Sequence, residues 1–204
     1  MKRTLKSVCL FLLVASIVLC NFVQVSAVSG KEVTLSFDKN DANVGEIITA
    51  TVSVDNITGF NGLQFHINYD PEVFQAVDPD TGVPYPASIN KYPYDTNALR
   101  SDLLLNSQYM PIEWASFDSV NGTIDVMRMY MYWRQYYAGG IDEPSGIVAR
   151  IGLKVLKKQE TTVYMQNTPA LIGGIDGTLV ACWDGTMVTD YQVQQVGNVI
   201  MQGY

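Results

Sequence analysis

VGEIITATVSV (residues 44–54) and GLQFHINYDPEVF (residues 62–74) are the two stretches that decide the fold of this chain. Apolar and polar residues alternate in both, and successive side chains of a β-strand point to opposite faces. Each stretch therefore predicts a strand with one face in an apolar core and one face outward. In the second stretch the outward residues are Gln64, His66 and Asn68. Asp70-Pro71 ends that strand, because Pro has no N–H to donate to a neighbouring strand.

Similar runs rich in β-branched and aromatic residues recur along the chain. They predict strands over residues 33–37, 47–54, 63–69, 123–133, 146–156, 161–165, 179–183 and 192–201. Eight or nine short strands, each with one buried face, indicate an all-β fold, a two-sheet sandwich or jelly roll.

Two of these runs place charged residues on the outward face. In residues 123–133 the alternate methionines predict the core side, which leaves Arg128 and Tyr130 outward. In residues 146–156 we expect Ile151 in the core, and Arg150 and Lys154 in solvent.

Residues 78–117 interrupt the strand rhythm, with four prolines crowded between Pro79 and Pro93. We interpret this segment as one long connection, with a turn or two of helix within residues 97–108. No segment of the chain keeps a helical period of apolar residues.

Composition excludes several function classes. The chain has 204 residues, 48% of them hydrophobic and 16% charged, which fits one globular domain. Its formal charge of −7 argues against nucleic-acid binding, since phosphate backbones would be repelled. One His, and three Cys without a C-x-x-C pair, are too few for a structural zinc site, and no glycine-rich nucleotide-binding motif is present. We expect no enzyme, no catalytic residue, no metal site and no cofactor on this chain.

The N-terminus has the features of a secretory signal peptide. Lys2, Arg3 and Lys6 precede an apolar run at residues 8–18, and Val25-Ser26-Ala27 offers a cleavage site. We therefore expect a signal peptide at residues 1–27 and a single secreted domain at residues 28–204, with an uncleaved membrane anchor as the alternative. The mature chain would carry 10 basic and 20 acidic residues, a formal charge of −10.

The two opening stretches, with Asn56-Ile57 between them, resemble the first half of a cohesin, the receptor module of bacterial cellulosomes. The likeness resumes at residues 146–155, at Gly173-Gly174 and at residues 196–201. It implies a nine-stranded jelly roll, secreted or held at a bacterial cell surface, that binds the dockerin of a partner enzyme or scaffold protein. Calcium would belong to the dockerin. The chain would contact plant cell-wall polysaccharide only indirectly. In its mature form it would not contact a membrane.

The resemblance also implies a partner-binding surface on the family's third, fifth, sixth and eighth strands. The positions carried over are Gly62, Gln64, His66 and Asn68 on the third strand, Arg128 and Tyr130 on the fifth, and Arg150 and Gly152 on the sixth. The family often has Asn and Asp at the positions of Gly62 and Gln64. This departure points to a divergent partner class.

Two other functions compete with this interpretation. A carbohydrate-binding module would use aromatic residues such as Trp133, Tyr136 and Tyr137 to stack on sugar rings. A glycosidase would need two carboxylates facing each other across a cleft. The available acidic residues, among them Asp70 and Asp176, lie beside Pro or Gly and are explained more simply as turn residues.

Overall fold

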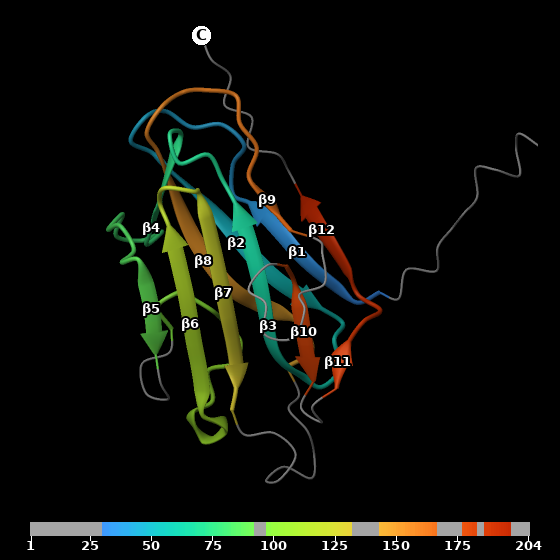
Figure 1. Ribbon diagram of the computed structural model, residues 1–204. Helices are drawn as coiled ribbons and strands as arrows, with labels where there is room; N and C mark the ends of the chain where they lie inside the picture. The colour runs from blue at the N-terminus through green and yellow to red at the C-terminus, as the bar shows by residue number, and fades with distance from the viewer. Residues whose placement is uncertain (1–29, 92–96, 132–142, 167–176, 183–185, 197–204) are drawn as a thin grey trace, which may run out of the picture.

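The computed structural model describes residues 30–91, 97–131, 143–166, 177–182 and 186–196. They form twelve strands in two sheets that pack face to face, seen in Figure 1 as a blue and brown layer behind a green and yellow one. The predicted all-β sandwich is confirmed. The described strands outnumber the nine expected because several, such as Tyr164–Met165 (β9) and Met187–Val188 (β11), are very short.

The five-stranded sheet has the order β12-β1-β2-β8-β4. Its members are Gln192–Val196 (β12), Glu32–Phe37 (β1), Ile47–Asp55 (β2), Gly146–Val155 (β8) and Phe74–Val77 (β4). β1 pairs in parallel with β12 and antiparallel with β2, so the first and last strands of the described chain lie side by side.

The seven-stranded sheet has the order β11-β10-β3-β7-β6-β5, with β9 also paired to β3. Its longer members are Leu179–Cys182 (β10), Phe60–Asn68 (β3), Thr123–Tyr130 (β7), Pro111–Asp118 (β6) and Ser88–Lys91 (β5). The pairs β3–β7 and β6–β7 run antiparallel in continuous register.

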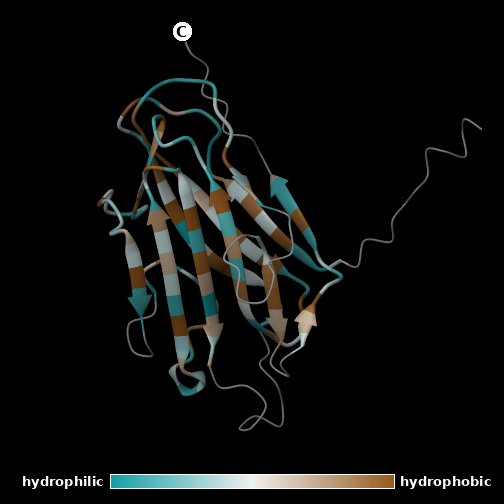
Figure 2. Cartoon of the chain, in the orientation of Figure 1, coloured by the Kyte–Doolittle hydropathy of each residue, from teal (hydrophilic) through white to brown (hydrophobic). Residues whose placement is uncertain are grey.

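The core lies between the two sheets and is built from the inward residues of both. Val52 and Ile151 come from the five-stranded sheet, Phe65 and Val126 from the seven-stranded one, and all four are fully buried. The banding along the strands in Figure 2 follows this alternation. Ile151 is inward and Lys154 outward, as the sequence predicts.

Residues 78–117 are not one connection, because they contain β5 and β6. The alternation in β6 is hidden, since Ile112 and Trp114 face outward while Ala115 and Phe117 are buried, so both faces are apolar. Among the residues of this segment that the structure describes, which exclude 92–96, the helix is a single 3-10 turn, Ser107–Tyr109 (η1).

The orientation predicted for β7 is wrong. Arg128 and Tyr130 are fully buried on the core side, whereas Met127 and Met129 lie on the outward side. The reason is the neighbouring strand: Glu113 of β6 lies directly opposite Arg128 and neutralises its charge inside the sandwich.

The placement predicted for Arg150 and Gly152 is also wrong. Both belong to β8, which pairs with β2 and β4 in the five-stranded sheet, so neither shares a sheet with β3 and β7. Gly152 is buried against β4, where a Cβ atom would lie 2.8 Å from the carbonyl oxygen of Val77. Its role is close strand packing.

Candidate binding face on the seven-stranded sheet

The outward residues of β3 and β7 form one continuous surface. Pairs in register across the two strands are Gly62 with Met129, Gln64 with Met127, His66 with Asp125, and Asn68 with Thr123. The four site residues predicted on β3 therefore lie together on one outward face, whereas the four predicted on β7 and β8 do not join them.

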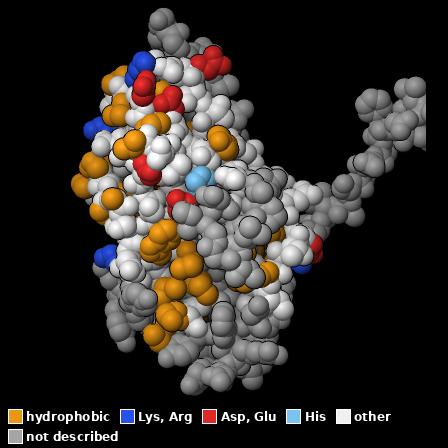
Figure 3. Space-filling view, in the orientation of Figure 1, with side chains coloured by type: hydrophobic (Ala, Val, Ile, Leu, Met, Phe, Trp, Pro, Cys, Tyr) orange, Lys and Arg blue, Asp and Glu red, His pale blue; other side chains and the backbone are white. Residues whose placement is uncertain are grey.

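One half of this surface is apolar, and we call it the methionine face. It comprises Ile112 and Trp114 of β6, Met127 and Met129 of β7, Leu179 and Ala181 of β10, and Met187 of β11. Each side chain is partly or well exposed, and Met187 is 42% exposed. Figure 3 shows hydrophobic side chains gathered over the lower part of β6 and β7.

Gly62 shapes the centre of the methionine face. A Cβ atom on Gly62 would collide with the Cβ of Met129 and lie 3.0 Å from the carbonyl oxygen of Arg128. The missing side chain leaves a small hollow of about 90 Å³, lined by Gly62, Leu63, Gln64, Met127, Arg128, Met129, Leu179, Ala181 and Met187. Only a glycine keeps this hollow open beside Met129.

The other half of the surface is polar and fixed by hydrogen bonds. His66 Nδ1 lies 2.5 Å from Asp125 Oδ1, and His66 Nε2 lies 3.2 Å from Asn68 Oδ1. The side chains of His66 and Asp125 are each only 9% exposed. This rigid polar cluster borders the methionine face at the next register position along β3.

An ion pair lies in the core directly beneath the methionine face. Arg128 Nη1 donates to the Glu113 carboxylate, whose other oxygen accepts from the backbone N–H of Ala98 at 3.0 Å. Burial raises the pKa of Glu113, and the facing charge of Arg128 opposes that rise. Because both groups are fully buried, removing either one would leave the other as a buried charge without its partner.

Tyr130 is a second buried polar support. Its hydroxyl donates to Glu143 Oε1 at 2.9 Å and accepts from the backbone N–H of Asn106 at 3.0 Å. Burial is the main cause of the raised pKa of Tyr130. The side chain thus ties the end of β7 to two loops and presents nothing to a partner.

Arg150 forms its contacts on the outer side of the other sheet. Its Nη2 lies 2.7 Å from Asp102 Oδ2, which anchors the segment before η1 against β8. A structural ion pair of this kind accounts for Arg150 without a partner.

Sequence reasoning missed the residues that make the outward surface apolar. Ile112 and Trp114 lie in a segment interpreted as a connection, and Met127 and Met129 were assigned to the core by their hydropathy. The signal that could have reversed this is charge pairing, because Glu113 and Arg128 both sit among apolar neighbours in strand-like runs.

The structure describes only part of the chain, so it tests few of the remaining sequence expectations. Within those ranges, no three His, Cys, Asp or Glu side chains gather as metal ligands would. The same ranges hold no helix with the length and apolar character needed to span a bilayer. Several predicted features lie outside the described residues: Trp133, Tyr136, Tyr137, Gly173-Gly174 and the signal peptide expected at residues 1–27.

A two-sheet sandwich with one apolar outer face defines a class of β-sandwich interaction modules. The sequence matches the Cohesin domain family over residues 33–189. The chain therefore belongs to the cohesin family, as its opening stretches predict.

Individual relatives agree with this assignment. The chain is 35% identical over 203 residues to Cell surface glycoprotein 1 of Acetivibrio thermocellus, and it spans 8% of the length of that much longer protein. A type II cohesin crystallised in a cohesin–X-dockerin complex from Acetivibrio cellulolyticus is 38% identical, with 83% of this chain and 98% of that chain covered and a TM-score of 0.71. The second type II cohesin module of an adaptor scaffoldin from the same organism is 36% identical, with 87% and 99% covered and a TM-score of 0.73.

Proposed function

We propose that this chain is a non-catalytic receptor that binds the dockerin of a partner protein through the methionine face. The observation that carries the proposal is the apolar surface on β6, β7, β10 and β11 of a cohesin sandwich. Contiguous apolar patches on a soluble protein mark interaction sites, because water is displaced from them when a partner docks.

The chemistry of the surface favours a helix with apolar side chains as the partner segment. Methionines are flexible and polarizable and adapt to irregular apolar shapes. Trp114 is a large aromatic anchor of the kind that dominates binding energy at interfaces. The solved relative crystallised with an X-dockerin supports a dockerin as the source of this helix.

Two residues of β3 that differ from those common in the family fit this proposal. Gly62 and Gln64 replace the Asn and Asp often found in the family, and they border the methionine face through Met129 and Met127. We infer that apolar contact takes the place of the polar contacts of the commonest cohesins. The identity of 38% and 36% to two type II cohesins supports a type II dockerin as the partner class.

The proposal also implies which protein binds calcium and where in the cell this chain acts. The calcium ions of the complex would belong to the dockerin, so a chelator should dissociate the complex by unfolding the partner and leave this chain folded. A cleaved signal peptide at residues 1–27 would deliver the domain of residues 28–204 outside the cell. Polysaccharide would then be met only through the dockerin-bearing partner.

The test is a calorimetric titration of the purified protein with calcium-loaded dockerins of the same organism. At least one type II dockerin should bind, and Met129→Glu should abolish that binding, because a carboxylate would be buried without a partner. Thr51→Glu, on the outer face of the five-stranded sheet, is the matched control and should bind as the parent does.

Two results would contradict the proposal. One is that no dockerin of the organism binds. The other is that Met129→Glu and Thr51→Glu bind equally well, because recognition would then use a different surface.

A further inference from the structure

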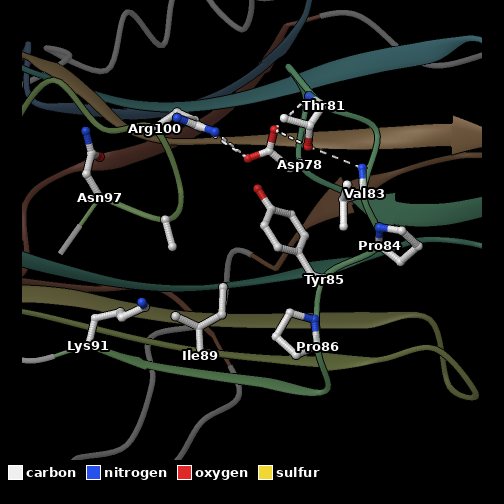
Figure 4. A pocket seen from close by; sticks show the side chains of 11 residues that line it. Asp78, Thr81, Val83, Pro84, Tyr85, Pro86, Ile89, Lys91, Asn97 and Arg100 are labelled. Carbon is white, nitrogen blue, oxygen red and sulfur yellow. Dashed lines mark hydrogen bonds and ion pairs between the residues drawn. The ribbon is translucent and has the colours of Figure 1, made fainter. Parts of the chain in front are cut away.

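A second hollow lies at the β5 edge of the seven-stranded sheet. It has a volume of about 710 Å³ and lies between the β4–β5 loop, β5, and the loop of residues 97–100 (Figure 4). Cavities of this size are typical of small-molecule sites. The residues that line it include none of those that form the methionine face.

The wall of this hollow is held in place by Asp78. One oxygen of Asp78 accepts from the backbone N–H groups of Asp80 and Thr81 at 3.0 and 2.9 Å. The other accepts from Arg100 Nη2 at 2.8 Å. The carboxylate therefore fixes both the loop and the guanidinium before any ligand arrives, which lowers the entropic cost of binding.

Several donors around the hollow lack a partner. The hydroxyl of Tyr85 is buried and has no hydrogen-bond partner within the described ranges. It points toward Asp78 and Arg100 in Figure 4. Buried polar groups are nearly always paired, so this hydroxyl beside the hollow is available to a ligand atom or to water. Burial raises the pKa of Tyr85, which keeps the phenol protonated and able to donate.

Two more donors line the same space. Arg100 uses Nε and Nη2 on Asp78, which leaves Nη1 without a partner in the described part of the chain. Asn97 accepts from the backbone N–H of Ser101 through Oδ1, and its Nδ2 has no described partner. The Arg100 side chain is 41% exposed, and the Tyr85 hydroxyl points toward it and toward Asp78 in Figure 4.

Much of the remaining lining is apolar, and the positive and negative side chains around the hollow are equal in number. Val83, Pro84, Pro86 and Ile89 line the hollow beside Tyr85, whose ring stacks on Phe117 with centroids 4.5 Å apart. Lys91 and Arg100 are offset by Asp78 and Asp80, and Asp80 lies 3.4 Å from Arg100. A site with no net charge, several unpaired donors and rigid apolar walls suits a neutral ligand that is rich in oxygen.

We propose that this hollow binds a short neutral oligosaccharide. Sugar hydroxyl oxygens would accept from Tyr85, Asn97 and Arg100, and the C–H faces of the sugar rings would pack on the Pro and Tyr surfaces. A carboxylate ligand fits less well, because Asp78 and Asp80 already occupy the positive field of Arg100. The proposed contacts come from residues other than those of the methionine face.

The experiment titrates cellohexaose and xylohexaose into the purified protein, followed by chemical-shift changes in NMR spectra. We expect saturable binding of at least one sugar, with a Kd of about 0.1–1 mM. Tyr85→Phe should weaken it about fivefold and leave the melting temperature unchanged or higher, because the hydroxyl has no intramolecular partner to lose. Arg100→Lys keeps the charge beside Asp78 but removes Nη1, and should also weaken binding.

The matched control is Met129→Ala on the methionine face, which should bind sugar as the parent does. Three results would overturn the proposal. The first is no saturable binding of either sugar up to about 10 mM, which corresponds to negligible affinity. The second is equal binding by the parent, Tyr85→Phe and Arg100→Lys. The third comes from a parallel titration with the acidic sugar oligogalacturonate: binding of that sugar alone would make the hollow a carboxylate site.

Discussion

The outer surfaces of the two sheets differ sharply although their inner surfaces are alike. The five-stranded sheet presents polar side chains to solvent, among them Thr49, Thr51 and Arg150. The seven-stranded sheet presents Trp114 and Met129 with their apolar neighbours. Since both inner faces are apolar, core patterning cannot tell which sheet binds a partner. The composition of the outward faces is what distinguishes the two sheets, and the proposed binding surface rests on it.

Two arginines in the middle of strands sharpen this comparison. Arg128 of β7 faces the core and Arg150 of β8 faces outward. Their sequence surroundings are similar, but Arg128 has Glu113 opposite it in register, whereas Arg150 has Thr51. A charged residue enters the core where the neighbouring strand supplies the opposite charge.

The largest expected effect is the loss of the buried ion pair. Arg128→Ala should lower the free energy of unfolding by about 4 kcal/mol, because Glu113 would be left as a buried charge without a partner. Urea denaturation measures this change. Arg150→Ala is the matched control and should cost about 1 kcal/mol or less, since that pair is partly exposed.

A double variant separates the charge from the packing in this prediction. Arg128→Met combined with Glu113→Leu should recover most of the stability, because no buried charge remains. If Arg128→Ala unfolds at the same urea concentration as the parent, the inward orientation of β7 is wrong.

The second-largest expected effect is a loss of stability from a substitution on the core side of the five-stranded sheet. Ile151→Ala should destabilise by about 3 kcal/mol, because it opens a cavity at a fully buried position. Lys154→Ala, outward on the same strand, should change stability by under about 0.5 kcal/mol. Equal effects in thermal denaturation would indicate that β8 is shifted by one residue.

A third effect should appear in binding and not in stability. Trp114→Ala should weaken dockerin binding by about 2 kcal/mol, roughly thirtyfold, because it removes a partly exposed aromatic anchor. The melting temperature should stay within a few degrees of the parent. Thr51→Ala, the equivalent test on the polar sheet, should leave the dissociation constant unchanged, and an equal loss there would mean that both faces take part.

The smallest effect concerns the loop held by Asp78. Burial acts to raise the pKa of Asp78, but hydrogen bonds from Thr81, Arg100 and Asp80 outweigh it and hold that pKa below its usual value of 3.8. The unfolded chain therefore binds this proton more tightly, so the contribution of Asp78 to stability is present above pH 4 and is lost as the pH falls through its folded pKa.

The substitution Asp78→Asn tests this predicted direction of the pH dependence of stability. The variant should be less stable than the parent at pH 7, and the two should converge toward pH 2 in urea denaturation experiments. A difference that grows as the pH falls would show that the carboxylate is not stabilised in the fold.

Strands β3 and β7 show most clearly which structural features can be predicted from the sequence. For β3, local alternation predicts both the inward residues, such as Phe65, and the outward ones, such as Gln64 and Asn68. For β7 the same reasoning exchanges the inward and outward faces, because methionine is normally expected in the core and arginine in solvent. The difference lies in Glu113, which is fifteen residues earlier in the chain and is placed opposite Arg128 only by strand pairing.

The sequence by itself determines the all-β class, the cohesin resemblance, the inward faces of β2, β3 and β8, and the β3 share of the candidate face. Those features depend on short-range alternation and on contiguous residues. Which sheet β8 joins, which way β7 faces, and where Ile112 and Trp114 lie are decided only by the tertiary structure. The physical reason is that hydrogen-bond register and charge pairing between strands distant in sequence set these outcomes, and they outweigh the preference of each residue taken alone.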